Sequence, residues 1–241
     1  MTLAPLGDSA VVVTFGTSID ESTLVRVRSL AAELELEKSP VIIDVVPAYT
    51  TVTVFYEIAP AGVNPEPPYE RVCRVISDCV KRIEHSWPDL VRANLEKRLP
   101  EVAVRVVEIP VCYGGAFGPD IEEVARHCGL TAGVVAELHS SAVYEVHAIG
   151  FTPGFPYLAG LSEKLHAPRR ATPRISVPAG SVGIGGRQTG VYPMSSPGGW
   201  QLIGRTPRVL FDVHRALPAL LRVGDRVKFV PISEEDFATW R

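Results

Sequence analysis

The 241-residue sequence has little of what marks several protein classes. It has four cysteines and no C-x-x-C pair, so neither a disulfide framework nor a zinc knuckle is predicted. Lys and Arg number 24 against 27 Asp and Glu, a net charge of −3 that argues against nucleic acid as a partner. Glycine and proline interrupt every long uncharged run, and the chain start lacks the features of a signal peptide. We therefore expect a cytoplasmic protein with reduced thiols and no membrane partner.

Several catalytic motifs are also absent. There is no G-x-x-x-x-G-K-[ST] sequence, so the chain contains no P-loop. The glycine cluster at 182–190 has Gln188 where a dinucleotide-binding motif needs its last glycine, and no helix is expected after it. Ser195 and Ser196 lack the G-x-S-x-G context of a serine nucleophile. No H-E-x-x-H sequence occurs, and we predict no metal site.

The apolar pattern of residues 1–95 predicts a small N-terminal domain. Ser18 and Glu21 have the spacing of a capping box at the start of its first helix. The order β-α-β-β-α is typical of a split β-α-β domain, with strands expected at Ala10–Phe15, Val41–Val46 and Thr51–Tyr56. Ser86–Pro100 is interpreted as a connection between domains.

Residues 100–241 have a different character. We expect a strand at Val102–Val111, followed by helices at Pro119–Cys128 and Thr131–Ser140. Beyond Ala142, short apolar runs alternate with glycine and proline, as in a β-barrel with tight turns. The predicted fold class is therefore α+β, with a small first domain and a barrel as the second.

Charge and glycine gather in the same part of the second domain. Residues 141–208 carry a net charge of +5, while the rest of the chain carries −8. Residues 150–200 hold ten of the twenty glycines. Backbone amides at glycines, beside arginines, can hold a carboxylate or a phosphate. Glycines at barrel corners with solvated arginines would give the same composition, and composition leaves both interpretations open.

Six stretches of this region carry a resemblance to a known family. They are Gly150–Leu158, Ala171–Arg174, Val177–Ile184, Gln188–Pro193, Ser196–Trp200 and Ile203–Pro207. On these motifs the chain resembles the KipI-type family, also called allophanate hydrolase subunit 1 and the 5-oxoprolinase B subunit. The resemblance extends over nearly the whole chain. It implies that the second domain is a cyclophilin-like β-barrel.

The resemblance also implies a function. The chain would be the B-type subunit of an ATP-dependent 5-oxoprolinase, which opens the lactam 5-oxoproline to L-glutamate. Its partners would be the A-type subunit of that enzyme and a KipA-type protein, the C-type subunit, with a site shared between the B-type and C-type chains. ATP, with Mg, would be used by the assembled complex, and the isolated chain would be inactive. Two alternatives stay open: inhibition of a sporulation-type sensor histidine kinase, and half of a biotin-dependent carboxyltransferase in an allophanate–urea system.

Lactam activation by phosphorylation needs cations and amide donors, and the motifs offer candidates for both. Arg174 and Arg205 are the predicted anion clamps, and His139 is the candidate for proton transfer. The predicted substrate contacts are Gly183, Gly185, Gly186, Gln188, Tyr192 and Ser196. Aromatic residues in the turns suit an interface with the C-type subunit, and those expected there are Phe151, Phe155, Tyr157 and Trp200. For Trp200, a place inside the barrel is an equal alternative.

Overall fold

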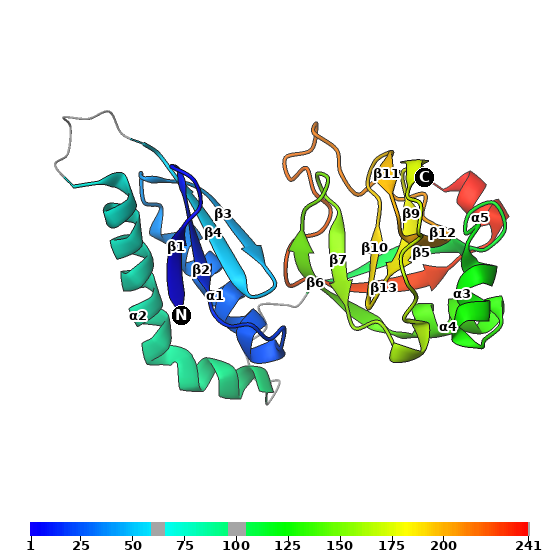
Figure 1. Ribbon diagram of the computed structural model, residues 1–241, viewed down its shortest axis with the longest axis horizontal. Helices are drawn as coiled ribbons and strands as arrows, with labels where there is room; N and C mark the ends of the chain where they lie inside the picture. Colours follow the sequence, from blue (N-terminus) through cyan, green and yellow to red (C-terminus); the bar gives the residue numbers. More distant parts are fainter. Residues whose placement is uncertain (59–65, 96–104, 241) are drawn as a thin grey trace. The chain divides into compact units, whose positions relative to one another are not determined.

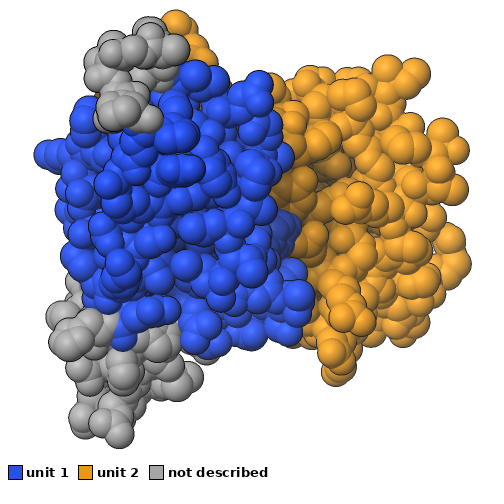
Figure 2. All heavy atoms as spheres, turned by 60° about the vertical axis from the view of Figure 1, so that its left-hand side comes forward, with its two compact units in different colours: residues 1–103 blue, residues 104–241 orange. Residues whose placement is uncertain are grey.

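The structure, a computed structural model, describes residues 1–58, 66–95 and 105–240. The chain divides into two compact units, residues 1–103 and 104–241, which Figure 1 shows as ribbons and Figure 2 in separate colours. Each unit has its own hydrophobic core. Within the described ranges, no helix combines the length and the apolar character needed to cross a membrane.

The first unit is an antiparallel sheet with two helices packed on one face (Figure 1). Its strands are, in spatial order, β1 (Thr2–Pro5), β2 (Ala10–Thr14), β4 (Thr51–Tyr56) and β3 (Ile42–Ala48). Its helices are α1 (Glu21–Glu37) and α2 (Pro68–Leu95). Apolar residues at helical spacing on α1 and α2 pack against every second residue of β2 and β4. Together these side chains form one hydrophobic core.

Three details of this unit differ from the prediction. Strand β1 precedes the expected β-α-β-β-α order and pairs with β2. Asp20, rather than a box of Ser18 and Glu21, caps α1, because its Oδ1 accepts the Thr23 N–H at 2.8 Å. Helix α2 continues to Leu95, so most of the expected connection is helical; residues 96–100 lie outside the described ranges.

The second unit is a closed barrel, which confirms the predicted α+β class with a β-barrel. The strand order is β6-β13-β5-β12-β9-β10-β7, and pairing of β7 with β6 closes it. Only β5 and β13 run parallel among these pairs. The bounds are β5 (Val106–Tyr113), β6 (Val143–Ile149), β7 (Pro156–Ala159), β9 (Ser181–Gly185), β10 (Gln188–Val191), β12 (Gln201–Arg205) and β13 (Arg226–Pro231).

Helices and a small sheet surround this barrel. Helices α3 (Ile121–Cys128) and α4 (Ala132–Ser141) pack against each other and against barrel strands, close to their predicted positions. Helix α3 begins at Ile121 with Asp120 as its N-cap, so it starts two residues after the predicted start at Pro119. Two short helices were not expected, η1 (Glu163–Leu165) and α5 (Glu234–Thr239). Strands β8 (Arg174–Val177) and β11 (Ser196–Gly198) form a separate two-stranded sheet.

Candidate functional site

An aromatic cluster gathers the motif stretches of the second unit. The Phe155 ring lies 5.1 Å from the Tyr192 ring and 5.5 Å from the Trp200 ring, edge to face in both cases. All three residues are buried together with Val177 of β8, and Tyr157 packs against them. Phe155 and Trp200 are 2% and 5% exposed and belong to the core, so their burial does not support the interface prediction and favours the inside alternative for Trp200.

The glycines of β9 and β10 make room for Trp200. A Cβ at Gly185 would lie 2.6 Å from the ring atoms Cε2 and Nε1 of Trp200, and one at Gly190 would lie 3.1 Å from its Cζ3. A Cβ at Gly183 would lie 3.1 Å from the Trp200 Cβ. Strand β9, which carries Gly183 and Gly185, is paired on both sides. Close packing, rather than amide donation to a substrate, therefore accounts for these two glycines.

Gly186 and Gln188 occupy the hairpin that joins β9 to β10. Gly186 has a φ of +67°, a left-handed conformation that favours glycine. Its N–H donates to the Ala167 carbonyl at 2.8 Å, so this amide too has a protein partner. Gln188 is half-buried at the start of β10. The geometry thus gives Gly186 a turn-forming role in place of the predicted substrate contact.

His139 lies in the core of the second unit and is fully buried. The Tyr113 hydroxyl donates to its Nδ1 at 2.8 Å, and its Nε2–H donates to the Thr189 Oγ1 at 2.8 Å. We assign these directions because the Thr189 hydroxyl itself donates, at 3.0 Å, to the Gly183 carbonyl. Burial lowers the pKa of His139 to about 3, so the ring is neutral. Both ring nitrogens are bonded inside the core, so this geometry does not support the predicted role of His139 in proton transfer.

Asp120 is the centre of a group of charged side chains. Its carboxylate is buried, and Oδ1 accepts from Arg174 Nη2 at 2.6 Å and from Arg170 Nη1 at 3.1 Å. The other oxygen, Oδ2, accepts the Leu202 N–H at 2.7 Å. The carboxylate therefore holds two guanidinium groups near the start of β12. Arg174, the predicted clamp, lies in this group.

The arginines adjoin the aromatic cluster. The guanidinium carbon of Arg169 lies 5.8 Å from the centre of the Trp200 ring, within the range of a cation–π interaction. Burial raises the pKa of Tyr192, while the Trp200 backbone N–H and the charges of Arg169 and Arg174 act in the opposite direction. Cations and aromatic rings thus form one continuous region, which we take as the candidate site.

Other predicted residues have separate environments. Arg205 donates through Nε to the Ala179 carbonyl at 2.8 Å, so its partner is the loop before β9. The hydroxyl oxygen of Ser196 is buried without a hydrogen-bond partner. Phe151 is 61% exposed and has a φ of +68°, which is strained for a residue with a side chain. Of the predicted interface residues, Phe151 is thus the most available to a partner.

Sequence reasoning missed Asp120, Arg169 and Arg170. Asp120 was interpreted only as part of a helix start, and its arginine partners come 50 and 54 residues later. The one available signal was the excess of basic residues in 141–208, which made a distant carboxylate partner worth seeking.

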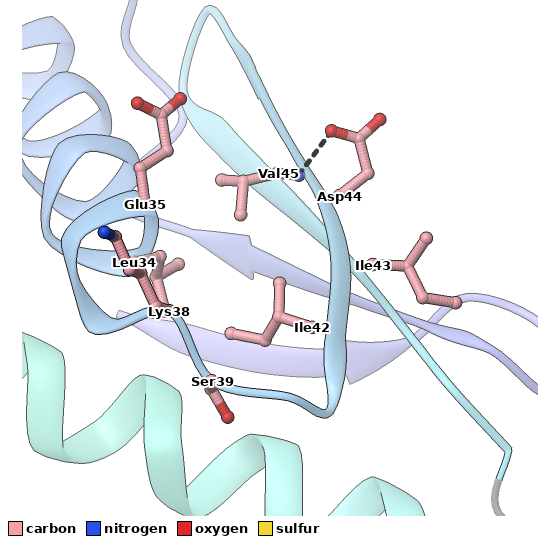
Figure 3. A pocket seen from close by; sticks show the side chains of 8 residues that line it. All are labelled: Leu34, Glu35, Lys38, Ser39, Ile42, Ile43, Asp44 and Val45. Atoms are coloured by element: carbon pink, nitrogen blue, oxygen red, sulfur yellow. Dashed lines mark hydrogen bonds between the residues drawn. The ribbon is translucent and has the colours of Figure 1, made fainter.

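Two further features bear on ligand binding. Among the described residues, no cluster of three or more His, Cys, Asp or Glu could hold a metal ion. A hollow in the first unit lies between the end of α1 and β3, and Figure 3 shows Ile42 and Val45 pointing toward Leu34. Its polar lining is Glu35, Lys38, Ser39 and Asp44. The hollow lacks the arginines and aromatic rings of the candidate site.

Comparison with known proteins gives a consistent picture. A family model described as carboxyltransferase domain, subdomain C and D, matches residues 1–221. The chain is 46% identical to the 5-oxoprolinase B subunit of Bacillus subtilis (strain 168), over 98% of this chain and 95% of that protein. It is 45% identical to the 5-oxoprolinase B subunit of Escherichia coli O157:H7, over 95% of each. The crystal structure of a conserved uncharacterized protein from Pyrococcus horikoshii is 42% identical, with a TM-score of 0.54 over 98% of this chain and 100% of that one. The chain therefore belongs to the family of carboxyltransferase domain subdomains C and D, together with the 5-oxoprolinase B subunits.

Proposed function

We propose that this chain is the B-type subunit of a multi-component, ATP-dependent 5-oxoprolinase that opens 5-oxoproline to L-glutamate. The observation that carries the proposal is the 46% identity to a 5-oxoprolinase B subunit over 98% of the chain. Mg–ATP enters the proposal as a co-substrate of the assembled complex, without assignment to this chain. The site would be shared with the C-type subunit, so the isolated chain would be inactive.

The chemistry of the reaction explains why a cationic region matters. A lactam carbonyl is a poor electrophile, and transfer of the ATP γ-phosphoryl group to its oxygen makes the carbon open to attack by water. ADP is the leaving group of this transfer. Breakage of the ring C–N bond, with a proton taken up by the nitrogen, then opens the lactam to an acyl phosphate of glutamate. A second water hydrolyses the acyl phosphate and releases L-glutamate and inorganic phosphate. Negative charge develops on the transferring group, and the substrate carries a carboxylate throughout. Arginines stabilise both kinds of anion, and Arg174 and Arg169 at the aromatic cluster are the candidates in this chain.

Phe151 is the proposed anchor for the C-type subunit. Its ring is exposed, lies 5.5 Å from the Phe155 ring, and is held in a left-handed backbone conformation. Strain of this kind is found where a residue is fixed for contact with a ligand or partner. A large aromatic side chain held in this way suits the centre of an interface.

Reconstitution tests the proposed function. The purified chain is combined with candidate A-type and C-type subunits, and ATP-dependent release of glutamate from 5-oxoproline is measured. We expect turnover with all three proteins and none when any one is omitted. Turnover by this chain alone, or no turnover by the full set, would contradict the proposal. The kinase-inhibitor and carboxyltransferase alternatives stay predictions, and the same preparation can be assayed for both.

A further inference from the structure

We propose that Arg170 and Arg174, held in place by Asp120, form an oxyanion-binding site for the substrate carboxylate or a phosphoryl group. The inference rests on the proposed function for the choice of ligand, and it adds Arg170 as a second cation. It also gives Asp120 the role of a positioning residue, because Asp120 acts through the two arginines.

Convergence on one oxygen is the first observation. Arg174 Nη2 and Arg170 Nη1 both donate to Oδ1 of Asp120, at 2.6 and 3.1 Å. The two guanidinium groups are therefore adjacent and fixed in orientation. Oδ2 is bound to the Leu202 N–H, and Asp120 itself is 4% exposed, so the carboxylate cannot rotate without loss of contacts.

Unpaired polar atoms of the two arginines, and of two residues that contact the same segment, are the second observation. Arg174 Nη1 and Arg170 Nε are buried and have no hydrogen-bond partner, and the same holds for Oγ of Ser196 and Oε1 of Gln201. Ser196 pairs with β8, and the Gln201 amide donates to the Pro168 carbonyl, so both adjoin the arginine segment. Buried donors without partners are unfavourable. A simple structural tether leaves the two arginine donors without partners, whereas the oxygens of a bound anion would accept from them.

The balance of charge and the exposure of the side chains favour an anion. Arg170 and Arg174 contact Asp120, and Glu123 lies 3.9 Å from Arg170, while the guanidinium group of Arg169 lies over the Trp200 ring. Residues 169–174 thus bring three cations to a region with two carboxylates. The Arg170 and Arg174 side chains are 31% and 24% exposed, so an anion can reach part of each group. Planar, paired N–H donors match the two oxygens of a carboxylate or phosphate.

Titration of the full-length chain tests binding directly. The probes are 5-oxoproline, inorganic phosphate, and 2-pyrrolidinone, which has the same lactam ring without a carboxylate. We expect the side-chain Nε–H NMR signal of Arg170 to shift with 5-oxoproline if the carboxylate is the ligand, or with phosphate if the phosphoryl group is. The signal should not respond to 2-pyrrolidinone. No response to either anion would overturn the site, whether or not the reconstituted complex is active.

Variants separate an anion site from a structural tether. Arg170→Lys and Arg174→Lys keep the charge but lose the paired geometry, and we expect affinity for the responding anion to fall about tenfold to a hundredfold. Asp120→Asn should have a similar effect on affinity, and in the active complex it should raise KM more than it lowers kcat if the anion is 5-oxoproline. Arg187→Lys, at an exposed arginine of the same basic region, is the matched control.

Thermal unfolding of each variant checks the fold. If Asp120→Asn fails to fold, the two lysine variants decide the question. Wild-type affinity and wild-type KM in both lysine variants would overturn the proposal. If the complex shows no turnover, the proposed function fails, and the titrations of the single chain still decide the anion site.

Discussion

Acid should destabilise the second unit through His139. The unfolded chain has an ordinary histidine pKa of about 6.5, whereas burial lowers the folded pKa to about 3. Between these values the unfolded state binds the proton and the folded state does not, so stability falls as pH falls. The contribution is fully present above pH 6.5 and is lost progressively toward pH 3. At about 1.4 kcal/mol per pH unit, acidification from pH 7.5 to pH 4.5 removes roughly 3 kcal/mol from the free energy of unfolding.

The assay compares the wild type with His139→Gln in urea at pH 7.5, 6.0 and 4.5. Glutamine keeps a donor and an acceptor but does not titrate, so other groups that respond to acid cancel in the difference. NMR signals of the second unit follow its unfolding separately. The variant should be less stable at pH 7.5, because Tyr113 and Thr189 lose ideal partners. The difference in unfolding free energy between the wild type and the variant should narrow by roughly 3 kcal/mol at pH 4.5. A gap independent of pH would refute the reasoning.

Three further substitutions, two of them with a control variant, test other features. Gly185→Ala should lower the free energy of unfolding by about 1–3 kcal/mol, because the new Cβ would lie 2.6 Å from the Trp200 ring. The control is Gly150→Ala, which should not lower the free energy of unfolding because no heavy atom lies within 4 Å of the added Cβ. Urea unfolding measures both, and equal losses would contradict the packing argument. Phe151→Gly should change the free energy of unfolding by less than about 1 kcal/mol, because relief of backbone strain offsets the lost ring contact. The same variant should capture less of the C-type subunit in a pull-down. Unchanged capture would remove Phe151 from the interface. Asp20→Ala should lower the stability of the first unit by about 1 kcal/mol, and Ser18→Ala should not, as thermal unfolding would show.

Periodic segments made most of the fold predictable. Strand β4 alternates buried with partly buried or exposed residues, and Gly129 caps the end of α3 in a left-handed conformation, as the sequence indicates. Strand β1 was missed because Thr-Leu-Ala-Pro carries no alternation and ends in proline. Its pairing with β2 is a tertiary interaction that local pattern does not reveal.

The candidate site was predictable only in part. Arg174 was found because it lies in a motif, but its contact with Asp120 joins positions 54 residues apart. The glycine cluster and Trp200 were found as separate features. Composition could not tell whether those glycines offer amides to a ligand or space to an indole ring, because both uses need a missing side chain. The sequence shows that His139 can transfer a proton in principle, but it does not show that the side chain is fully buried.

The parallel pairing of β5 with β13 has a consequence for synthesis on the ribosome. Strand β5 lies between β12 and β13, so both of its neighbours come from the C-terminal part of the chain. Val106 of β5 pairs with Arg226, which is translated 120 residues later. At about 5–20 residues per second, the nascent β5 waits roughly 6–24 s for its partners. During that interval its apolar edge is open to chaperones or to misassembly, so production of this protein should depend on translation speed and chaperone supply.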